Sequence, residues 1–374
     1  MMTRQKRITA RHAKIQAFQE SAAALSTNNI FGLPFSVKES EVVLTPVPWE
    51  VTVSFRPGTA KGPEAICEAS GQVDLYDPFT HDAWKYGFAM ERVDRRITEM
   101  GAILRATAAK LIHCQQYGTP DDLPVAELTR QVNEGGARLN RLLEIKSLHH
   151  LERGKIVGIV GGDHSAPLGL MRALAKHHSH YGILHIDAHF DHRDSYEGFE
   201  FSHASIMRNA SYIPEIEKFV HVGIRDYCKE EMDVVIRSPE RFFIYTDSEI
   251  SDRKFCSVVD SSLSSISWHT QCQYMISHLP KHVYISFDID GLDQTLCPNT
   301  GTPVPGGLNF QEVRFLLEHV VKSGRKIIGF DLCEVAPAPN CENFAADWNA
   351  NVGSRILYKL CSLAAQSVFG PHKD

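Results

Sequence analysis

YGILHIDAHFDHRD, residues 181–194, decides the fold, because an apolar run ends in a cluster of acidic and histidine side chains. Its first seven residues are typical of a buried β-strand. In open α/β sheets, ligand-binding side chains follow the carboxyl ends of the strands. The stretch therefore predicts an α/β sheet with a functional site at one edge.

The same alternation of elements continues along the chain. From Lys155 onward, short β-rich runs are separated by segments with helical spacing. The further runs are Val42 to Pro48, KIVGIV (155–160), KFVHVGI (218–224), RFFIYT (241–246), HVYISFDID (282–290) and KIIGFDL (326–332). Such a rhythm predicts an α/β fold, a three-layer α-β-α sandwich with a mainly parallel sheet. Asn309 is expected to begin a helix as its N-cap.

The domain organisation follows from this division. Residues 1–40 are expected to form an N-terminal arm, and residues 41–374 a single α/β domain. Within it, residues 93–150 carry two helical patterns separated by the breaker YGTPDDLP. We expect a helical pair there, inserted into the α/β framework.

Composition and charge exclude several classes of function. The net charge is −6, and no block of Lys and Arg is interleaved with aromatic residues, so nucleic acid is not an expected partner. No apolar run reaches 18 residues, so no membrane span is expected, and the prediction is a cytoplasmic protein. Nine scattered cysteines without a CxxC pair indicate reduced thiols.

Four segments that follow or end the apolar runs carry the chemistry: VGGDHS (160–165), HIDAHFDHRD (185–194), SFDIDGLD (286–293) and DLCEVAP (331–337). In a strand, residues i and i+2 point to the same side, so Asp187 is expected to pair with His189, and Asp288 with Asp290. Asp191 and His164 can join them. Isolated residues receive the ordinary interpretation: Asp293 as a turn residue and His192 as a solvated loop histidine.

Together, six side chains are predicted to be metal ligands: His164, Asp187, His189, Asp191, Asp288 and Asp290. Four carboxylates crowded together would repel one another and force protonation, whereas two divalent cations would neutralise them. Carboxylate and imidazole without thiolate suit Mn²⁺, Fe²⁺, Ni²⁺ or Zn²⁺. The sequence therefore predicts a binuclear metal site.

The motifs GGDHS, DAHFD, SFDIDGLD and the glutamate of DLCEVAP resemble those of the ureohydrolase (arginase and agmatinase) family, and the chain is closest in character to agmatinase-like and guanidine hydrolase members. The resemblance covers about Val42 to Tyr76 and Lys155 to the C-terminus. It implies an arginase-like fold, two metal ions, with Mn²⁺ as the default and Ni²⁺ as the alternative, and a homo-oligomer, either a trimer or a hexamer.

The resemblance also implies roles for individual residues. One metal would be held by His164, Asp187, Asp191 and Asp288, and the other by His189, Asp187, Asp288 and Asp290. A hydroxide bridging the two ions would attack the carbon of a guanidino compound and release urea. Glu334 would orient the guanidinium and His203 would shuttle a proton, so both would contact substrate. Asp191, beside the hydroxide, is expected to pass the proton to the leaving amine.

Departures from the family pattern bear on the substrate. The chain reads SHASIM (202–207) at the shuttle position, and HRDSYEGFEFS (192–202) lacks the asparagine and serine run with which arginases grip the amino acid. Agmatine and free guanidine are therefore favoured over arginine. PNTGTPVPGG (298–307) is expected to form pocket wall, and the arm or the helical pair could supply a lid. The alternatives are a formiminoglutamate-type or other C–N hydrolase of the same fold, and a catalytically silent regulatory subunit.

Overall fold

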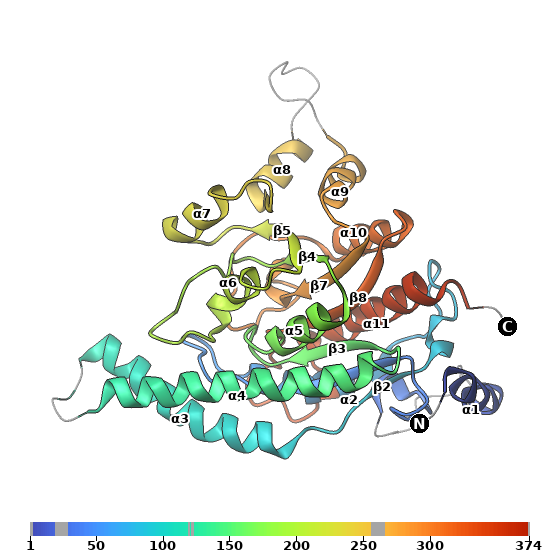
Figure 1. The fold of residues 1–374 in the computed structure, drawn as a ribbon, viewed down its shortest axis with the longest axis horizontal. Coiled ribbons are helices and arrows are strands. Elements are labelled where there is room, and N and C mark those ends of the chain that lie inside the picture. Colours follow the sequence, from blue (N-terminus) through green and yellow to red (C-terminus); the bar gives the residue numbers. More distant parts are fainter. Residues whose placement is uncertain (1–2, 19–28, 119, 121–122, 256–265, 373–374) are drawn as a thin grey trace.

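The computed structural model describes residues 3–18, 29–118, 120, 123–255 and 266–372 (Figure 1). Its centre is one sheet of eight strands in the order β2-β1-β3-β8-β7-β4-β5-β6. The strands are β1 (Val42–Val47), β2 (Phe88–Met90), β3 (Ile156–Gly161), β4 (Tyr181–Ile186), β5 (Ile216–Ile224), β6 (Phe242–Thr246), β7 (His282–Phe287) and β8 (Lys326–Leu332). Every pair of neighbours is parallel, which confirms the predicted α/β architecture.

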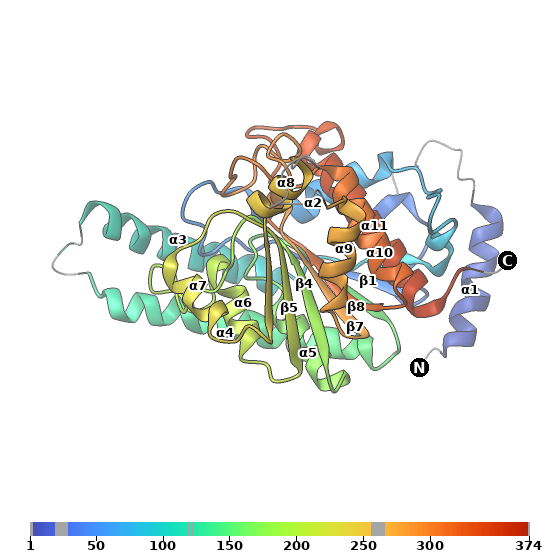
Figure 2. The ribbon, with the colours of Figure 1, turned by 90° about the horizontal axis from the view of Figure 1, so that it is seen from above.

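Helices cover both faces of the sheet (Figure 2). One face packs against α3 (Arg95–Tyr117), α4 (Val125–Leu151), α5 (Leu168–His177), α6 (Ile206–Ser211) and α7 (Lys229–Ile236). The other packs against α2 (Gly62–Ala69), α8 (Asp247–Phe255), α9 (Trp268–Ser277), α10 (Phe310–Lys322) and α11 (Trp348–Phe369). Central strands are buried on both sides, so they read as continuous apolar runs. Asn309 caps α10 as predicted, in a capping box with Glu312.

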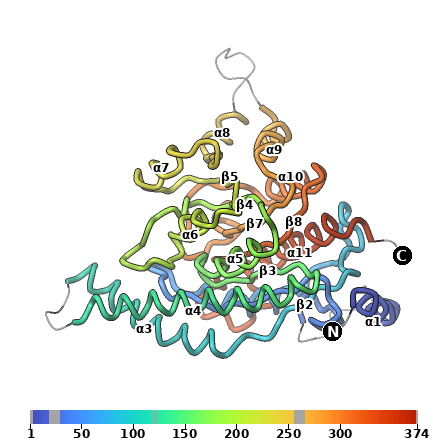
Figure 3. Tube along the Cα trace, in the orientation of Figure 1, coloured from blue at the N-terminus to red at the C-terminus, as the bar shows by residue number. Residues whose placement is uncertain are grey.

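The predicted helical pair is observed as α3 and α4. The two helices form a long hairpin whose far end projects beyond the rest of the molecule (Figures 1 and 3). On the half of the hairpin that includes this end, Gln115 Nε2 donates to the Glu197 carbonyl at 3.0 Å and Asn133 Nδ2 donates to the Gly198 carbonyl at 3.1 Å. The hairpin therefore supports the loop that follows β4.

The N-terminal arm packs near the amino ends of the strands, whereas the residues of the four motifs lie at the carboxyl ends. Within it, α1 (Arg4–Ala17) presents Arg7 and Arg11 to the carboxylate of Glu41, at 2.8 and 3.0 Å, and all three side chains are nearly buried. Glu41 directly precedes β1, so this contact lies at the amino end of the strand. α1 is therefore not the lid that the arm was expected to be able to supply.

Two further sequence predictions can be compared with the structure. The cysteines that the structure describes are all free thiols. In the same part of the chain, no helix combines the length and the apolar character needed to cross a bilayer. In contrast, β2 was not predicted, because three residues at the sheet edge give no readable period.

Candidate metal centre

The functional side chains meet where β3, β8, β7 and β4 end, and these four strands are consecutive in the sheet. His164 follows β3, Glu334 follows β8, Asp288 and Asp290 follow β7, and Asp187, His189 and Asp191 follow β4. All six predicted metal ligands are brought together by this arrangement. The strand order thus places residues from distant parts of the sequence at one edge.

The local geometry differs from the strand alternation that we expected. β4 ends at Ile186 and β7 ends at Phe287, so the ligand-bearing residues lie beyond both strands. Asp288 caps a short 3₁₀ turn, Ile289–Gly291, by accepting a hydrogen bond from the Asp290 backbone N–H at 2.8 Å. The i and i+2 argument was therefore wrong for this pair, because a tight turn and not a strand brings the two carboxylates together.

His164 is the clearest indication of a cation site. Ser286 Oγ donates its only hydrogen to Asp331 Oδ2 at 2.9 Å. The second partner of the Ser286 hydroxyl, His164 Nε2 at 2.9 Å, must therefore be the donor in that hydrogen bond. A neutral imidazole carries only one N–H, which leaves a lone pair on Nδ1. That nitrogen faces three carboxylate oxygens, of Asp187 and Asp191 at 3.0 Å and Asp288 at 3.4 Å. Because all four atoms are lone-pair donors, a proton or a metal cation is needed between them.

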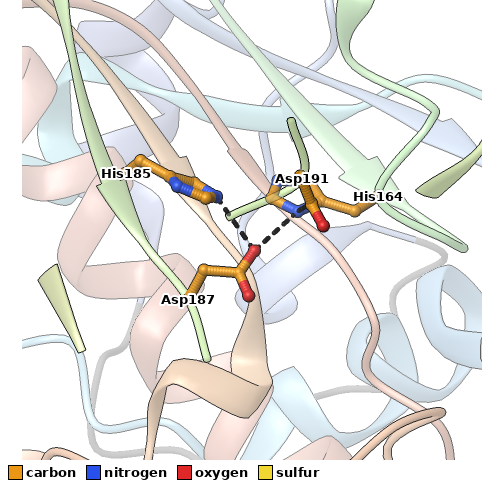
Figure 4. Close-up of side chains that lie close together, drawn as sticks. All are labelled: His164, His185, Asp187 and Asp191. Atoms are coloured by element: carbon orange, nitrogen blue, oxygen red, sulfur yellow. Dashed lines mark hydrogen bonds and ion pairs between the residues drawn. The ribbon is translucent and has the colours of Figure 1, made fainter. Parts of the chain in front are cut away.

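The second cluster has the same character. His189 Nδ1 lies 3.1 Å from Asp290 Oδ2 and 3.5 Å from Asp187 Oδ1. Asp290 Oδ2 is buried and makes no hydrogen bond in the structure. Two ligand atoms that approach without hydrogen-bond geometry fit a shared metal ion. Asp187 therefore borders both clusters, because His164 lies against one of its oxygens, as Figure 4 shows, and His189 lies against the other.

Electrostatics support this interpretation. Burial raises the pKa of Asp288 well above its ordinary range, and the nearby Asp290 and Asp187 carboxylates add to the effect. Burial and Asp187 likewise raise the pKa of Asp191 to about 6. Although burial alone would lower it, Asp187 and Asp191 raise the pKa of His164 well above its usual value. Without metal the cluster must take up protons, and divalent cations would replace them.

Above the clusters lies a cavity of about 260 Å³. Four of the predicted ligands reach its wall, namely His164, His189, Asp191 and Asp288, and the predicted substrate residues His203 and Glu334 line it too. Asp187 and Asp290 are not part of the wall. Thr302, Pro303 and Val304 contribute to the wall as the sequence predicted for residues 298–307, whereas no described residue of α1, α3 or α4 does.

Glu334 is held firmly in this cavity. Its Oε1 accepts a hydrogen bond from the His164 backbone N–H at 2.9 Å, and its own backbone is left-handed, with φ of 63°. Burial raises the pKa of Glu334 well above its ordinary range, with a further contribution from Asp163. A buried carboxyl group of this kind is prepared to pair with a cationic substrate.

His203 lies in the same cavity, half-buried beside Thr52 and Tyr196. Its Nδ1 is 3.4 Å from Thr52 Oγ1, and the Tyr196 ring packs edge-on against it at 5.8 Å. Burial and the neighbouring His189 and His164 imidazoles lower the pKa of His203 to about 3. A neutral imidazole at this place can accept a proton.

Other acidic residues of the motifs lie outside the two clusters. Asp293 forms a turn with Thr295, in line with its ordinary interpretation. The carboxylate of Asp331 faces inward and accepts hydrogen bonds from Tyr284 and Ser286.

Two histidines near the clusters were misjudged or missed at the level of sequence. The interpretation of His192 as solvated was wrong, because its side chain is buried. Sequence reasoning also missed His185, whose Nε2 lies 2.9 Å from Asp187 Oδ2. His185 lies between apolar residues in the buried strand β4, where a core residue would also lie, so no local sequence pattern distinguished it as a functional residue.

Comparisons with known proteins agree with this geometry. Residues 40–361 match the model of the arginase family. An N(1)-aminopropylagmatine ureohydrolase of Thermus thermophilus is 30% identical over 304 residues, which cover 80% of this chain and 84% of that protein. An agmatinase of Bacillus anthracis is 28% identical over 306 residues, 81% of this chain and 86% of that protein. Among solved structures, the proclavaminate amidino hydrolase from Streptomyces clavuligerus superposes with a TM-score of 0.68 at 21% identity, covering 93% of this chain and 100% of that one.

Proposed function

Because this chain belongs to the arginase family, we propose that it is a ureohydrolase of the agmatinase type, which hydrolyses agmatine to urea and an amine. The observation that carries the proposal is His164 Nδ1, which faces three carboxylates beneath a cavity that also holds Glu334. Such a site suits a pair of cations below and a guanidinium group above.

The ligand set fits two divalent ions, for which we propose Mn²⁺ or Ni²⁺. His164, Asp187, Asp191 and Asp288 would hold one of them. His189, Asp187, Asp288 and Asp290 would hold the other. When bound, the ions supply a strong nucleophile at neutral pH by lowering the pKa of water.

The remaining steps belong to residues of this chain. The Glu334 carboxylate would pair with the guanidinium and hold its plane toward the clusters. Water adds to the guanidinium carbon, and the C–N bond to the leaving amine breaks. Asp191 would accept one proton from the attacking water and pass it to the leaving amine nitrogen, and the neutral His203 would take up the second proton of that water and relay it to the same amine. The products are urea and an alkylammonium ion, so atoms and charge balance.

Asp226 favours an amine-tailed substrate over free guanidine. It lines the cavity, its side chain is 67% exposed, and its Oδ2 lies 3.9 Å from His189 Nε2. A carboxylate at this distance from the clusters can bind the terminal ammonium of agmatine, which free guanidine lacks. Arg193 also lines the cavity, but its guanidinium packs over the Tyr196 ring. It is therefore less available to bind a carboxylate on the tail of a substrate.

The test is urea release by protein loaded with Mn²⁺ or Ni²⁺, measured with agmatine, guanidine, arginine, guanidinobutyrate and formiminoglutamate. We expect agmatine to give the highest kcat/KM. In Asp226→Asn, KM for agmatine should rise by about two- to fivefold, the value of one exposed ion pair, while the parameters for guanidine stay unchanged. No urea from any compound would contradict the reaction, and an Asp226→Asn effect shared equally by guanidine would contradict the substrate assignment.

A further inference from the structure

Three buried histidines extend from Asp187 into the protein, away from the cavity. His185 Nε2 lies 2.9 Å from Asp187 Oδ2, and this contact is the dashed line between the two residues in Figure 4. His185 Nδ1 lies 2.9 Å from His221 Nδ1. His221 Nε2 in turn lies 3.3 Å from His192 Nε2. His185 and His221 are 0% exposed and His192 is 1% exposed. The three rings form a continuous chain between β4, β5 and the loop after β4.

The positions of the protons in this chain follow from its two ends. At one end, an ionised Asp187 can only accept a hydrogen bond, so His185 Nε2 donates to it. If each ring is neutral, His221 Nδ1 then donates to His185 and His192 Nε2 donates to His221. This leaves His192 Nδ1 with a lone pair, and that atom is buried without a hydrogen-bond partner.

The opposite direction is less favourable at the other end of the chain. It would place an N–H on His192 Nδ1, and a buried N–H without an acceptor is rarer in proteins than a buried acceptor without a donor. Apart from His221, which lies against Nε2, the rings packed on His192 are those of Phe190, Phe219 and Phe242, and none of these carries an ordinary acceptor. Burial lowers the pKa of His221 well below its usual value, which keeps the middle ring neutral.

Asp187 gains a fixed orientation from this chain. Its Oδ1 accepts the His189 backbone N–H at 2.6 Å, while its Oδ2 accepts from His185. Each oxygen therefore has one hydrogen bond from the protein and another lone pair toward the two clusters. A carboxylate shared by two metal ions needs this, because rotation about its C–C bond would weaken both sites at once.

We propose that His185, His221 and His192 are positioning residues, whose aligned N–H groups lock Asp187 in the orientation that binds both metal ions. The proposal rests on the metal centre of the proposed function. His221 is its most informative member, because its side chain hydrogen-bonds to the other two rings and to none of the six proposed ligands. Hydrogen-bond partners of this kind change metal affinity by about 10- to 100-fold.

The experiment compares wild type, His221→Phe and His221→Asn in a competition between the protein and a chelator for Mn²⁺. His221→Phe keeps an aromatic ring beside Phe219 and Phe242 but removes the donor. We expect its Mn²⁺ affinity to fall by about 10- to 100-fold. His221→Asn retains an N–H near the position of Nδ1 and should recover most of the loss, which a merely space-filling role of the ring would not explain.

A second measurement needs no variant. Nitrogen NMR of histidine-labelled, metal-free wild type should show protons on His185 Nε2, His221 Nδ1 and His192 Nε2. The reverse tautomers, or unchanged affinity in a folded His221→Phe, would overturn the inference. Wild type that binds no Mn²⁺ would overturn the proposed function instead, so the two failures are distinguishable.

Discussion

At the scale of single residues, the site depends on backbone conformations that side chains rarely adopt. Asp191 and Glu334 both lie in the left-handed region, with φ of 56° and 63°. Such a residue costs roughly 1–3 kcal/mol and persists only where its surroundings fix it. For Glu334, these are hydrogen bonds from its N–H to the Gly162 carbonyl, at 2.8 Å, and from Thr300 Oγ1 to its carbonyl, at 2.9 Å. Two of the residues to which we assign chemistry are thus held in a strained backbone conformation.

Glu334→Gln tests the role of the carboxylate in pairing with the guanidinium. The amide keeps the size but not the charge, so we expect kcat/KM to fall on the order of 100-fold, as for loss of a buried charged partner. Thermal unfolding should show no loss of stability, because burial raises the pKa of Glu334 and a neutral side chain relieves that cost. Asp293→Asn, which changes a carboxylate outside the cavity, should leave the kinetics unaltered. Equal kinetics in Glu334→Gln and wild type would show that the carboxylate does not act on substrate.

At the scale of elements, the α3 and α4 hairpin stabilises the loop that carries Tyr196 and leads to His203. Asn133 on α4 makes two contacts with this loop: it donates to Gly198 and accepts from the Glu200 N–H at 2.9 Å. The hairpin does not line the cavity itself. Its contribution to function is therefore indirect, through the position of the loop.

Asn133→Ala removes both contacts at once. Two hydrogen bonds of ordinary strength are worth about 1–3 kcal/mol together, and the loop they hold bears cavity residues. We expect KM for agmatine to rise and kcat to fall, each by several-fold, with only a small change in melting temperature. Gln131→Ala is the control, because Gln131 is exposed on the same helix and bonds to Glu127. Steady-state kinetics identical in the two variants would argue against a supporting role for the hairpin.

Much of the element pattern could be predicted from the sequence, and the reasons are physical. Strands buried on both faces appear as apolar runs, and the cap at Asn309 follows from its side chain, so these were recognisable. The convergence of His164, Asp187 and Asp288 was predicted as well, because each follows an apolar run. The strand order that produces this convergence was not, since no local pattern tells that β8 lies between β3 and β7. His185 and His221 were missed because a buried histidine in a strand has the same period as a core residue.

At the scale of the whole molecule, we expect metal binding and folding to be coupled. Four carboxylates lie together at one edge of the sheet. Burial raises the pKa of Asp288 and of Asp191, and the neighbouring carboxylates raise both further. A ligand that binds only the folded state adds about 2.7 kcal/mol at a hundred times its dissociation constant. The proposed ions therefore stabilise the fold as well as the reaction.

Removal of metal should lower the melting temperature. With excess chelator at neutral pH we expect a decrease of several degrees, which added Mn²⁺ reverses. The melting temperature of Asp288→Asn should not respond to the chelator, because this substitution removes a ligand shared by both metal ions and part of the repulsion between the carboxylates. Calorimetry of both proteins with and without chelator measures this directly. A wild-type melting temperature that does not respond to chelator would contradict a metal pair at this site.

The position of β8 has a consequence for how the protein is made. β8 is the last strand in the sequence, yet it lies in the sheet between β3 and β7. While a nascent chain still lacks it on the ribosome, His164 has no sheet neighbour on the side of Asp288, and Glu334 has not been synthesised. Catalytic competence therefore arises only once the C-terminal segment has emerged and inserted, so that premature termination yields an inert polypeptide instead of a weakened enzyme.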